Sequence, residues 1–194
     1  MSNNKKKLEE LQTLMANPTY HITSYLNVIT TPLNVVEDGD TFEANALKKV
    51  TAIKPEALPN PTKTIIIADD SGLEVDALDN RPGIHSARYG GKNLTDTQRC
   101  HALLTELGTT TNRNARFVCV IALRFPNGIT KTQRGVVDGT ITTTLSGDHG
   151  FGYDPIFIPK GYNKSFAVLG KQVKSKISHR SQALQKVKDL IYTT

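Results

Sequence analysis

Charged residues in the first half of this sequence have the side chains needed to bind phosphate groups together with a metal ion. Asp69 and Asp70 follow a short apolar run, and Glu37 precedes a predicted helix that carries Lys49. Carboxylate oxygens suit Mg²⁺, which takes one or two carboxylates and completes its shell with substrate phosphates and water. The Asp-Asp-Ser-Gly run at 69–72 is also a good turn sequence, so taken alone it leaves a purely structural role open.

A glycine-rich segment over 146–155 has a composition that lets the backbone approach a ligand closely. Three glycines lie within the seven positions 146–152. Phe151 is placed to stack on a nucleobase, an interaction that contributes about 1–3 kcal/mol with little preference for one base. Asp154 is available for a hydrogen bond to the edge of that base. The local sequence favours a plainer alternative, a hairpin loop whose Phe151 and Tyr153 pack into the core.

The C-terminal part of the chain carries its basic charge. Between positions 160 and 190 eight Lys or Arg residues accompany one acidic residue, a local charge of +7 in a chain whose net charge is +6. Ser178 is a natural N-cap, so His179 and Arg180 begin a final helix whose free N–H groups and positive dipole end favour anions. Lys174 extends this positive region. A solvated basic helix explains the same charge pattern and stays open at this point.

The elements expected to position these side chains are helices and strands of ordinary length. Apolar residues recur at helical spacing after Thr41, and this helix places Asn45 and Lys49 on one face. The β-branched run 64–68 is expected to be a buried strand with the two aspartates at its carboxyl end, the edge at which open α/β sheets bind ligands. The other expected elements are a helix over 4–16, a strand over 20–29, a helix over 96–107, a hairpin of strands 116–125 and 129–145 that turns at 126–128, and a helix after Ser178. We therefore expect a mixed α/β fold with a largely antiparallel sheet.

Length and composition exclude several classes of protein. A chain of 194 residues with 38% hydrophobic and 22% charged residues is expected to form one globular domain. No apolar run approaches the roughly 18 residues that a membrane span needs, and the polar start over 1–10 lacks the apolar region of a signal peptide. Cys100 and Cys119 are isolated, so neither a disulfide framework nor a zinc site is expected. We expect a cytoplasmic protein without a membrane partner.

Five segments of the chain, in order, resemble the signature segments of the inosine triphosphate pyrophosphatase family. They cover residues 41–46, 69–89, 115–119, 150–157 and 177–184. The resemblance runs from residue 2 to about residue 190. It implies an elongated α/β fold, with a two-lobed mixed sheet flanked by helices and a central nucleotide cleft, in a single domain over 1–194. It further implies a homodimer that uses Mg²⁺ to hydrolyse the purine nucleoside triphosphates ITP, dITP and XTP to the monophosphate and pyrophosphate, with no nucleic-acid partner.

The resemblance also assigns roles to individual residues. Asp70 corresponds to the general base and a metal ligand, and Glu37 to the other carboxylate of the metal site. The residues that match substrate-binding positions are Ser2, Asn4, Lys7, Lys49, Ser71, Phe151, Gly152, Tyr153, Asp154, Lys174, His179 and Arg180. A base with a 6-oxo group and no 2-amino group would then fit a pocket of donors from backbone N–H groups, His179 and Arg180, whereas the amino group of adenine would leave these donors unpaired.

Three departures from the family pattern leave alternatives open. Only Met1 precedes the motif at 2–4, where the family has an apolar strand. Ala44 replaces a frequent Glu, and Arg99 replaces a frequent Asn at a position expected on the surface or in an interface. The missing strand favours a catalytically weakened nucleotide-binding or RNA-binding protein, and a pyrophosphatase for another modified nucleotide is a further alternative. The retained carboxylates argue against an RNA binder, because they repel nucleic-acid phosphates.

Overall fold

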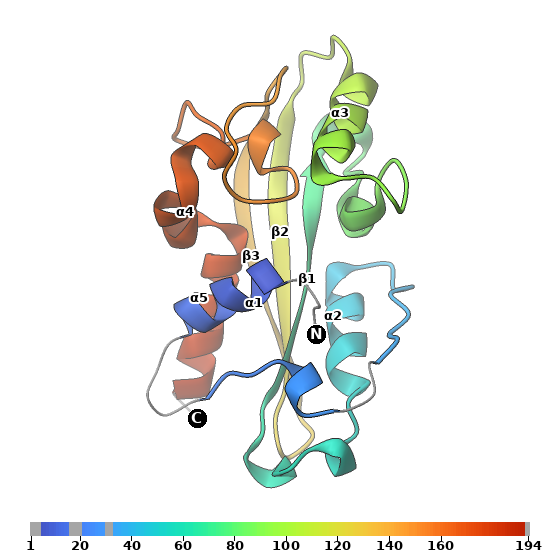
Figure 1. Ribbon diagram of the computed structural model, residues 1–194, viewed down its shortest axis with the longest axis vertical. Coiled ribbons are helices and arrows are strands. Elements are labelled where there is room, and N and C mark those ends of the chain that lie inside the picture. The colour runs from blue at the N-terminus through green and yellow to red at the C-terminus, as the bar shows by residue number, and fades with distance from the viewer. Residues whose placement is uncertain (1–4, 16–20, 30–32, 193–194) are drawn as a thin grey trace. The chain divides into compact units, whose positions relative to one another are not determined.

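A computed structural model describes residues 5–15, 21–29 and 33–192 of the chain (Figure 1). Ser2 and Asn4, which the resemblance assigns to phosphate binding, lie outside these described residues. The helices and strands are α1 (Lys5–Leu14), α2 (Phe42–Thr51), β1 (Ile66–Val75), α3 (Asp96–Leu107), β2 (Asn114–Arg124), β3 (Thr130–Ile141), β4 (Phe157–Pro159), α4 (Phe166–Ile177) and α5 (His179–Tyr192). Short 3₁₀ helices are η1 (Tyr25–Asn27), η2 (Pro55–Ala57), η3 (Pro61–Lys63), η4 (Asp76–Leu78), η5 (Gly83–Arg88) and η6 (Asp154–Ile156). Within the described ranges no helix is long and apolar enough to cross a membrane.

The four strands form one antiparallel sheet in the order β1-β2-β3-β4, so the predicted mixed α/β class is confirmed. The predicted hairpin joins β2 to β3, and its turn is closed by the N–H of Phe125, which donates to the carbonyl of Ile129 over 2.9 Å. β3 ends at Ile141, four residues before the predicted end, and pairs there with Phe157 of β4. β4 and α4 were not among the elements that the sequence predicted.

The chain divides into two compact units. The first unit comprises Met1–Asp70, Cys119–Arg134 and Ala183–Thr194. Its core cluster consists of Met15, Cys119, Ile121, Leu123, Ala183, Leu184, Val187 and Ile191. The members from β2 lie at every second position and those from α5 at spacings of one, three and four, as expected when a strand and a helix each bury one face. The predicted apolar stripe of the last helix is therefore confirmed.

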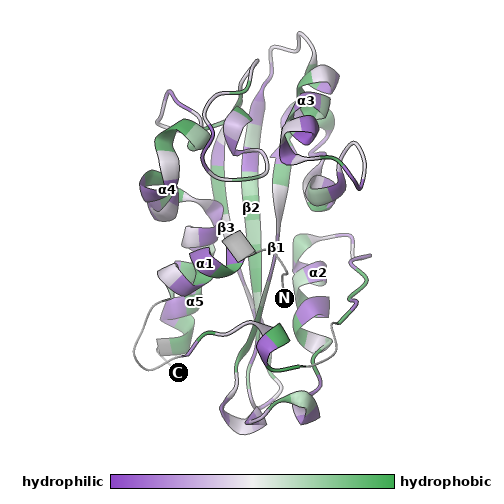
Figure 2. Cartoon of the chain, viewed as in Figure 1, coloured by the Kyte–Doolittle hydropathy of each residue, from purple (hydrophilic) through white to green (hydrophobic). Residues whose placement is uncertain are grey.

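The second unit comprises Ser71–Val118 and Gly135–Gln182. Its core cluster consists of Leu73, Val75, Leu78, Cys100, Leu103, Leu107, Ala115, Phe117, Val137, Ile141, Tyr153, Ile156, Phe157 and Phe166. The Phe117 ring lies 4.6 Å from that of Phe157 and 6.3 Å from that of Phe166, measured between ring centres. β2 is mostly hydrophobic along its length (Figure 2), and its residues from Phe117 to Leu123 are all buried. This strand therefore contributes to the core of each unit.

Helix starts follow the local rules that the sequence displays. Thr41 caps α2, because its side-chain oxygen accepts a hydrogen bond from the N–H of Ala44. Ser178 precedes α5, and its Oγ accepts a hydrogen bond from the N–H of Ser181 over 3.1 Å. The predicted cap at Ser178 is confirmed. These caps fix the first turns of the two helices that carry Lys49 and Arg180.

Two predictions about strands are wrong. Residues 21–29 form no strand; they contain η1, which Ser24 caps through a hydrogen bond from the N–H of Leu26. The strand expected over 64–68 instead continues as β1 to Val75, so Asp69 and Asp70 lie in its interior and not at its end. The polar run Asp-Asp-Ser-Gly is accommodated inside a strand because both carboxylates have lysine partners from other elements.

Candidate active site

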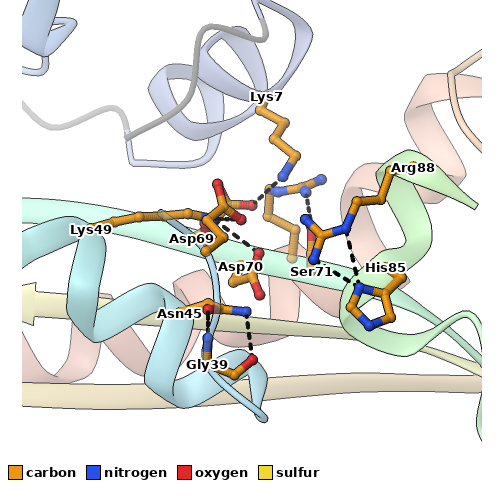
Figure 3. Close-up of polar contacts among 11 residues, drawn as sticks. Lys7, Gly39, Asn45, Lys49, Asp69, Asp70, Ser71, His85 and Arg88 are labelled. Carbon is orange, nitrogen blue, oxygen red and sulfur yellow. Dashed lines mark hydrogen bonds and ion pairs between the residues drawn. The ribbon is translucent and has the colours of Figure 1, made fainter. Parts of the chain in front are cut away.

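Lys49 of α2 is the centre of a polar cluster in the first unit (Figure 3). Its ammonium group lies 3.0 Å from Oδ1 of Asp70, 2.9 Å from Oε2 of Glu37 and 3.1 Å from the carbonyl oxygen of Asp69. An ammonium group has three N–H donors, and each has an acceptor here. A direct contact between Lys49 and a phosphate, as the resemblance implies, therefore requires one of these acceptors to be exchanged.

Asn45 fixes the loop that delivers Glu37. It lies one helical turn before Lys49, as the sequence predicted, and its side chain is buried. Its Oδ1 accepts a hydrogen bond from the N–H of Gly39 over 2.9 Å, and its Nδ2 donates to the carbonyl of Gly39 over 3.4 Å (Figure 3). A Cβ at position 39 would lie only 2.8 Å from Oδ1 of Asn45, so glycine is required for this close approach.

Asp70 has one oxygen held by Lys49 and a second for which the described residues provide no donor. Its Oδ2 is buried and has no hydrogen-bond partner among the described residues. Burial raises the pKa of Asp70 above its ordinary value, although the charge of Lys49 opposes this. Burial lowers the pKa of Lys49, but the charge of Asp70 and the hydrogen bonds to Glu37 and Asp70 outweigh it, so the pKa of Lys49 lies above its usual value. This cluster therefore keeps a cation beside its two carboxyl groups.

The same cluster has the donor set that a hard divalent cation uses. A buried carboxylate oxygen without a donor is a suitable ligand for such an ion, and Glu37 is a second carboxylate beside the same lysine. Within the described part of the chain, no three His, Cys, Asp or Glu side chains are grouped to hold a metal by themselves. Mg²⁺ does not need such a group, because it is commonly bound by one or two carboxylates plus substrate phosphates. The residues present fit Mg²⁺ in that mode.

Lys7 of α1 adds a second cation to this unit. Its Nζ lies 3.0 Å from Oδ2 of Asp69 (Figure 3). Successive side chains of a strand point to opposite faces, which agrees with Asp69 and Asp70 having different lysine partners. The family resemblance implies that Lys7 binds phosphate. In the structure this lysine pairs with Asp69, one of the two adjacent aspartates of β1.

In the second unit, Phe151 lies against two cations. The Nζ of Lys174 is 4.3 Å from the centre of its ring, and the guanidinium carbon of Arg180 is 5.9 Å from it. Lys174 and Asp154 form a buried ion pair. Phe151 is partly exposed, whereas Tyr153 packs in the core. The local alternative in which both aromatic residues belong to the core is therefore correct only for Tyr153.

The backbone of the glycine-rich loop is already hydrogen-bonded within the unit. The N–H of Phe151 donates to Oδ2 of Asp154 over 2.9 Å, and the N–H of Gly152 donates to Oδ2 of Asp96 over 2.7 Å. These two N–H groups therefore already have acceptors within the unit. Recognition of a base by backbone N–H groups, as the resemblance implies, needs donors that are available to the base. Asp154 is almost fully buried, and its Oδ2 is bound to the loop and to Lys174.

His179 and Arg180 are both buried at the start of α5. Nη2 of Arg180 donates to Oγ of Ser71 over 3.1 Å, and the His179 ring stacks on Phe117 with ring centres 4.9 Å apart. The structure thus brings Ser71, Phe151, Lys174 and Arg180 into one connected set. Supporting roles for Phe117 and Asn45 were not predicted. The sequence offered a signal only for Asn45, its helical spacing to Lys49.

Comparison with known proteins agrees with this fold. The model of the Ham1 family matches residues 1–190. A Staphylococcus aureus (strain MW2) protein named dITP/XTP pyrophosphatase is 43% identical over 183 residues, which cover 94% of this chain and 90% of that protein. The Staphylococcus aureus Ham1 protein has a solved structure with a TM-score of 0.86 and 42% identity, covering 99% of this chain and 96% of that one. A HAM1 protein from Coxiella burnetii also has a TM-score of 0.86, at 36% identity, covering 100% of this chain and 96% of that one.

Fold and side chains together define an α/β protein that carries a carboxylate–lysine cluster in one unit and an aromatic–cation cluster in the other. The family match over nearly the whole chain makes the assignment specific. The chain belongs to the Ham1 family.

Proposed function

We propose that this protein hydrolyses the non-standard purine nucleoside triphosphates ITP, dITP and XTP to the monophosphate and pyrophosphate. The observation that carries the proposal is the buried Asp70, which has one oxygen on Lys49 and the other without a donor among the described residues. Relatives named dITP/XTP pyrophosphatase support the choice of substrate. A nucleotide hydrolase needs such a carboxylate beside cations, whereas a pure nucleic-acid binder gains nothing from it.

In this proposal water attacks the α-phosphorus of the substrate. A bond forms between the water oxygen and that phosphorus, and the bond from the phosphorus to the oxygen that bridges to the β-phosphate breaks. Asp70 accepts the proton of the water on its carboxylate group. Pyrophosphate leaves with the bridging oxygen.

The cations of the first unit take the negative charge of the phosphates. Lys7 and Lys49 each lie 3.0 Å from an aspartate oxygen, so both are held in place before substrate arrives. Asp70 and Glu37 are the residues that would hold Mg²⁺. When bound, Mg²⁺ offsets charge on the phosphates and the leaving pyrophosphate. Ser2 and Asn4 complete the proposed phosphate-binding set.

The aromatic–cation cluster of the second unit is proposed to bind the base. Phe151 provides a partly exposed ring for stacking, and Lys174, His179 and Arg180 provide hydrogen-bond donors. A 6-oxo group accepts from such donors, whereas the 6-amino group of adenine leaves them unpaired, which is a strong rejection mechanism. Gly152, Tyr153 and Asp154 support this set through the loop.

The test is pyrophosphate release from ITP, XTP, GTP and ATP in the presence of Mg²⁺. We expect release from ITP and XTP and little from GTP or ATP. Asp70→Asn should lower kcat by a factor of roughly 10²–10⁴, the usual contribution of a general base. Asp38→Asn is the matched control, since Asp38 is an exposed acid of the same unit that pairs with Lys48. A folded protein that releases pyrophosphate from none of the four would contradict the proposal.

The proposal includes a cytoplasmic homodimer without a nucleic-acid partner. Both cysteines are buried thiols, as is usual in a reducing compartment. Light scattering of the purified protein tests the dimer. RNA binding that weakens steeply with added salt would support the RNA-binding alternative, because only phosphate contacts release counterions.

A further inference from the structure

The backbone N–H and the carbonyl of Gly152 both contact residues at the start of α3. Its N–H donates to Oδ2 of Asp96 over 2.7 Å, and its carbonyl accepts from the thiol of Cys100 at 3.4 Å. The first bond has a charged acceptor, and such hydrogen bonds are stronger than neutral ones. Asp96 and Cys100 are 56 and 52 positions from Gly152 in the sequence. Neither residue belongs to the site that the sequence predicted.

Asp96 is itself held by Arg99. Nη1 of Arg99 lies 3.1 Å from Oδ1 of Asp96, and Nη2 donates to the carbonyl of Leu94 over 2.9 Å. Arg99 is only 7% exposed within this chain, so of the two expected positions, the surface and an interface, the surface is wrong. Arg99 is buried because its guanidinium joins the loop before α3 to the first turn of that helix. One carboxylate oxygen of Asp96 is thus fixed by Arg99, and the other is directed at Gly152.

Gly152 occupies the bend that sets the geometry of the loop. It has φ +62°, a conformation that favours glycine, and the next residue, Tyr153, has φ −90° and ψ 10°. The N–H of Asp154 donates back to the carbonyl of Phe151 over 3.3 Å and closes the turn. A shift of Gly152 therefore moves Phe151 on one side and the Asp154–Lys174 pair on the other.

We propose that Asp96 is a positioning residue for base recognition, acting through the N–H of Gly152. Its carboxylate, oriented by Arg99, holds the turn so that the ring of Phe151 and the ammonium of Lys174 are arranged before the base binds. The inference rests on the proposed function, in which these two groups bind the purine. Preorganisation of this kind lowers the ordering cost of binding and leaves the chemical step unchanged.

The kinetic test compares Asp96→Ala and Asp96→Asn with the wild-type protein, using ITP at saturating Mg²⁺. We expect Asp96→Ala to raise KM about tenfold, the effect of losing one charge-assisted hydrogen bond, with kcat within about twofold. Asp96→Asn keeps an oxygen acceptor for Gly152 and should raise KM only about twofold to threefold. Asp138→Asn is the control, because it removes the same charge from an exposed position of β3 in the same unit; its KM should not change.

A second readout does not depend on catalysis. Hydrogen exchange of the Gly152 amide, followed by NMR without nucleotide, should be about tenfold faster in Asp96→Ala than in the wild-type protein. A KM for ITP within twofold of wild type, or unchanged exchange at Gly152, would overturn the inference. If Asp96→Ala fails to fold, Asp96→Asn gives a weaker form of the test: KM about twofold to threefold above wild type is expected, and a KM equal to wild type would overturn the inference. A wild-type protein that cleaves none of the nucleotides contradicts the proposed function instead, and the exchange rates still show whether Asp96 holds the loop.

Discussion

The ammonium of Lys49 lies 3.0 Å from Oδ1 of Asp70, and the two side chains are only 6% and 9% exposed. A buried ion pair adds little net stability, because desolvation of both charges offsets their attraction. Removing one partner destabilises the protein, because the remaining charge is then left in a poorly solvated environment. Lys49 is therefore needed to compensate the buried charge of Asp70, in addition to any role toward phosphates.

Lys49→Met should destabilise the protein by about 3–5 kcal/mol, the usual effect of leaving a buried charge without its partner. Lys48→Met is the matched control, because the neighbouring Lys48 forms an exposed pair with Asp38, and such pairs contribute about 1 kcal/mol or less. Urea denaturation in the presence of a chelator measures both. Equal free energies of unfolding for the two variants would contradict the burial of the Lys49–Asp70 pair.

Asn45→Ala should weaken metal binding through Glu37. The substitution leaves the N–H of Gly39 without its acceptor and frees the loop that delivers Glu37. Loss of a residue that orients a ligand typically weakens metal affinity by about tenfold or more. Mn²⁺ titration followed by electron paramagnetic resonance measures this without any turnover.

Asn127→Ala is the control for that experiment. Asn127 also accepts a backbone hydrogen bond, from the N–H of Ile129 over 3.1 Å, but it lies in the exposed hairpin turn. Its Mn²⁺ affinity should equal that of the wild-type protein. An Asn45→Ala variant that binds Mn²⁺ as tightly as this control would contradict the positioning of Glu37 by Asn45.

Local features of the sequence were sufficient for the elements that position Lys49 and Arg180. The helical spacing from Asn45 to Lys49 and the cap at Ser178 are both confirmed. They are predictable because a helix start and a helix face depend on residues within about four positions of each other. The family resemblance, which rests on similar local segments, is confirmed by the match over 1–190.

The errors arise where distant partners decide the structure. A run of two aspartates looks like a turn, and only Lys7 and Lys49, from two other elements, explain why Asp69 and Asp70 lie inside β1. Similarly, Asp96 looks like a helix-start acid, and nothing near it in the sequence points to Gly152. Burial of a charge is a tertiary property, so periodicity and turn propensity do not reveal it.

Neither cysteine should react while the protein is folded. Cys100 and Cys119 are fully buried, and burial raises the pKa of Cys100 to about 12, with the charge of Asp96 adding to the effect. The thiolate is the reactive form, so raising the pH from 7 to 9 leaves Cys100 protonated. A thiol reagent such as DTNB should detect no thiol in the native protein at pH 8 and two in guanidinium chloride. One rapidly reacting thiol in the native protein would contradict this burial.

Alanine substitutions at two glycines of the same loop, Gly150 and Gly152, distinguish the effect of displacing Asp154 from the effect of backbone strain. Both have positive φ, +82° at Gly150 and +62° at Gly152, so an alanine at either costs about 1–2 kcal/mol of strain. A Cβ at Gly150 would also overlap Oδ2 of Asp154, whereas at Gly152 nothing lies within 4 Å. Gly150→Ala should therefore push Asp154 away from Lys174 and from the N–H of Phe151.

We expect Gly150→Ala to raise KM for ITP about tenfold and Gly152→Ala about twofold, with the larger loss of thermal stability in Gly150→Ala because it also separates a buried ion pair. Because the strain is common to both variants, the difference in KM isolates the Asp154–Lys174 pair. Steady-state kinetics with ITP and thermal denaturation of the two proteins provide the comparison. Equal KM values would mean that the buried pair does not hold the base-binding ring, and the assignment of Lys174 and Phe151 to the base would lose its support.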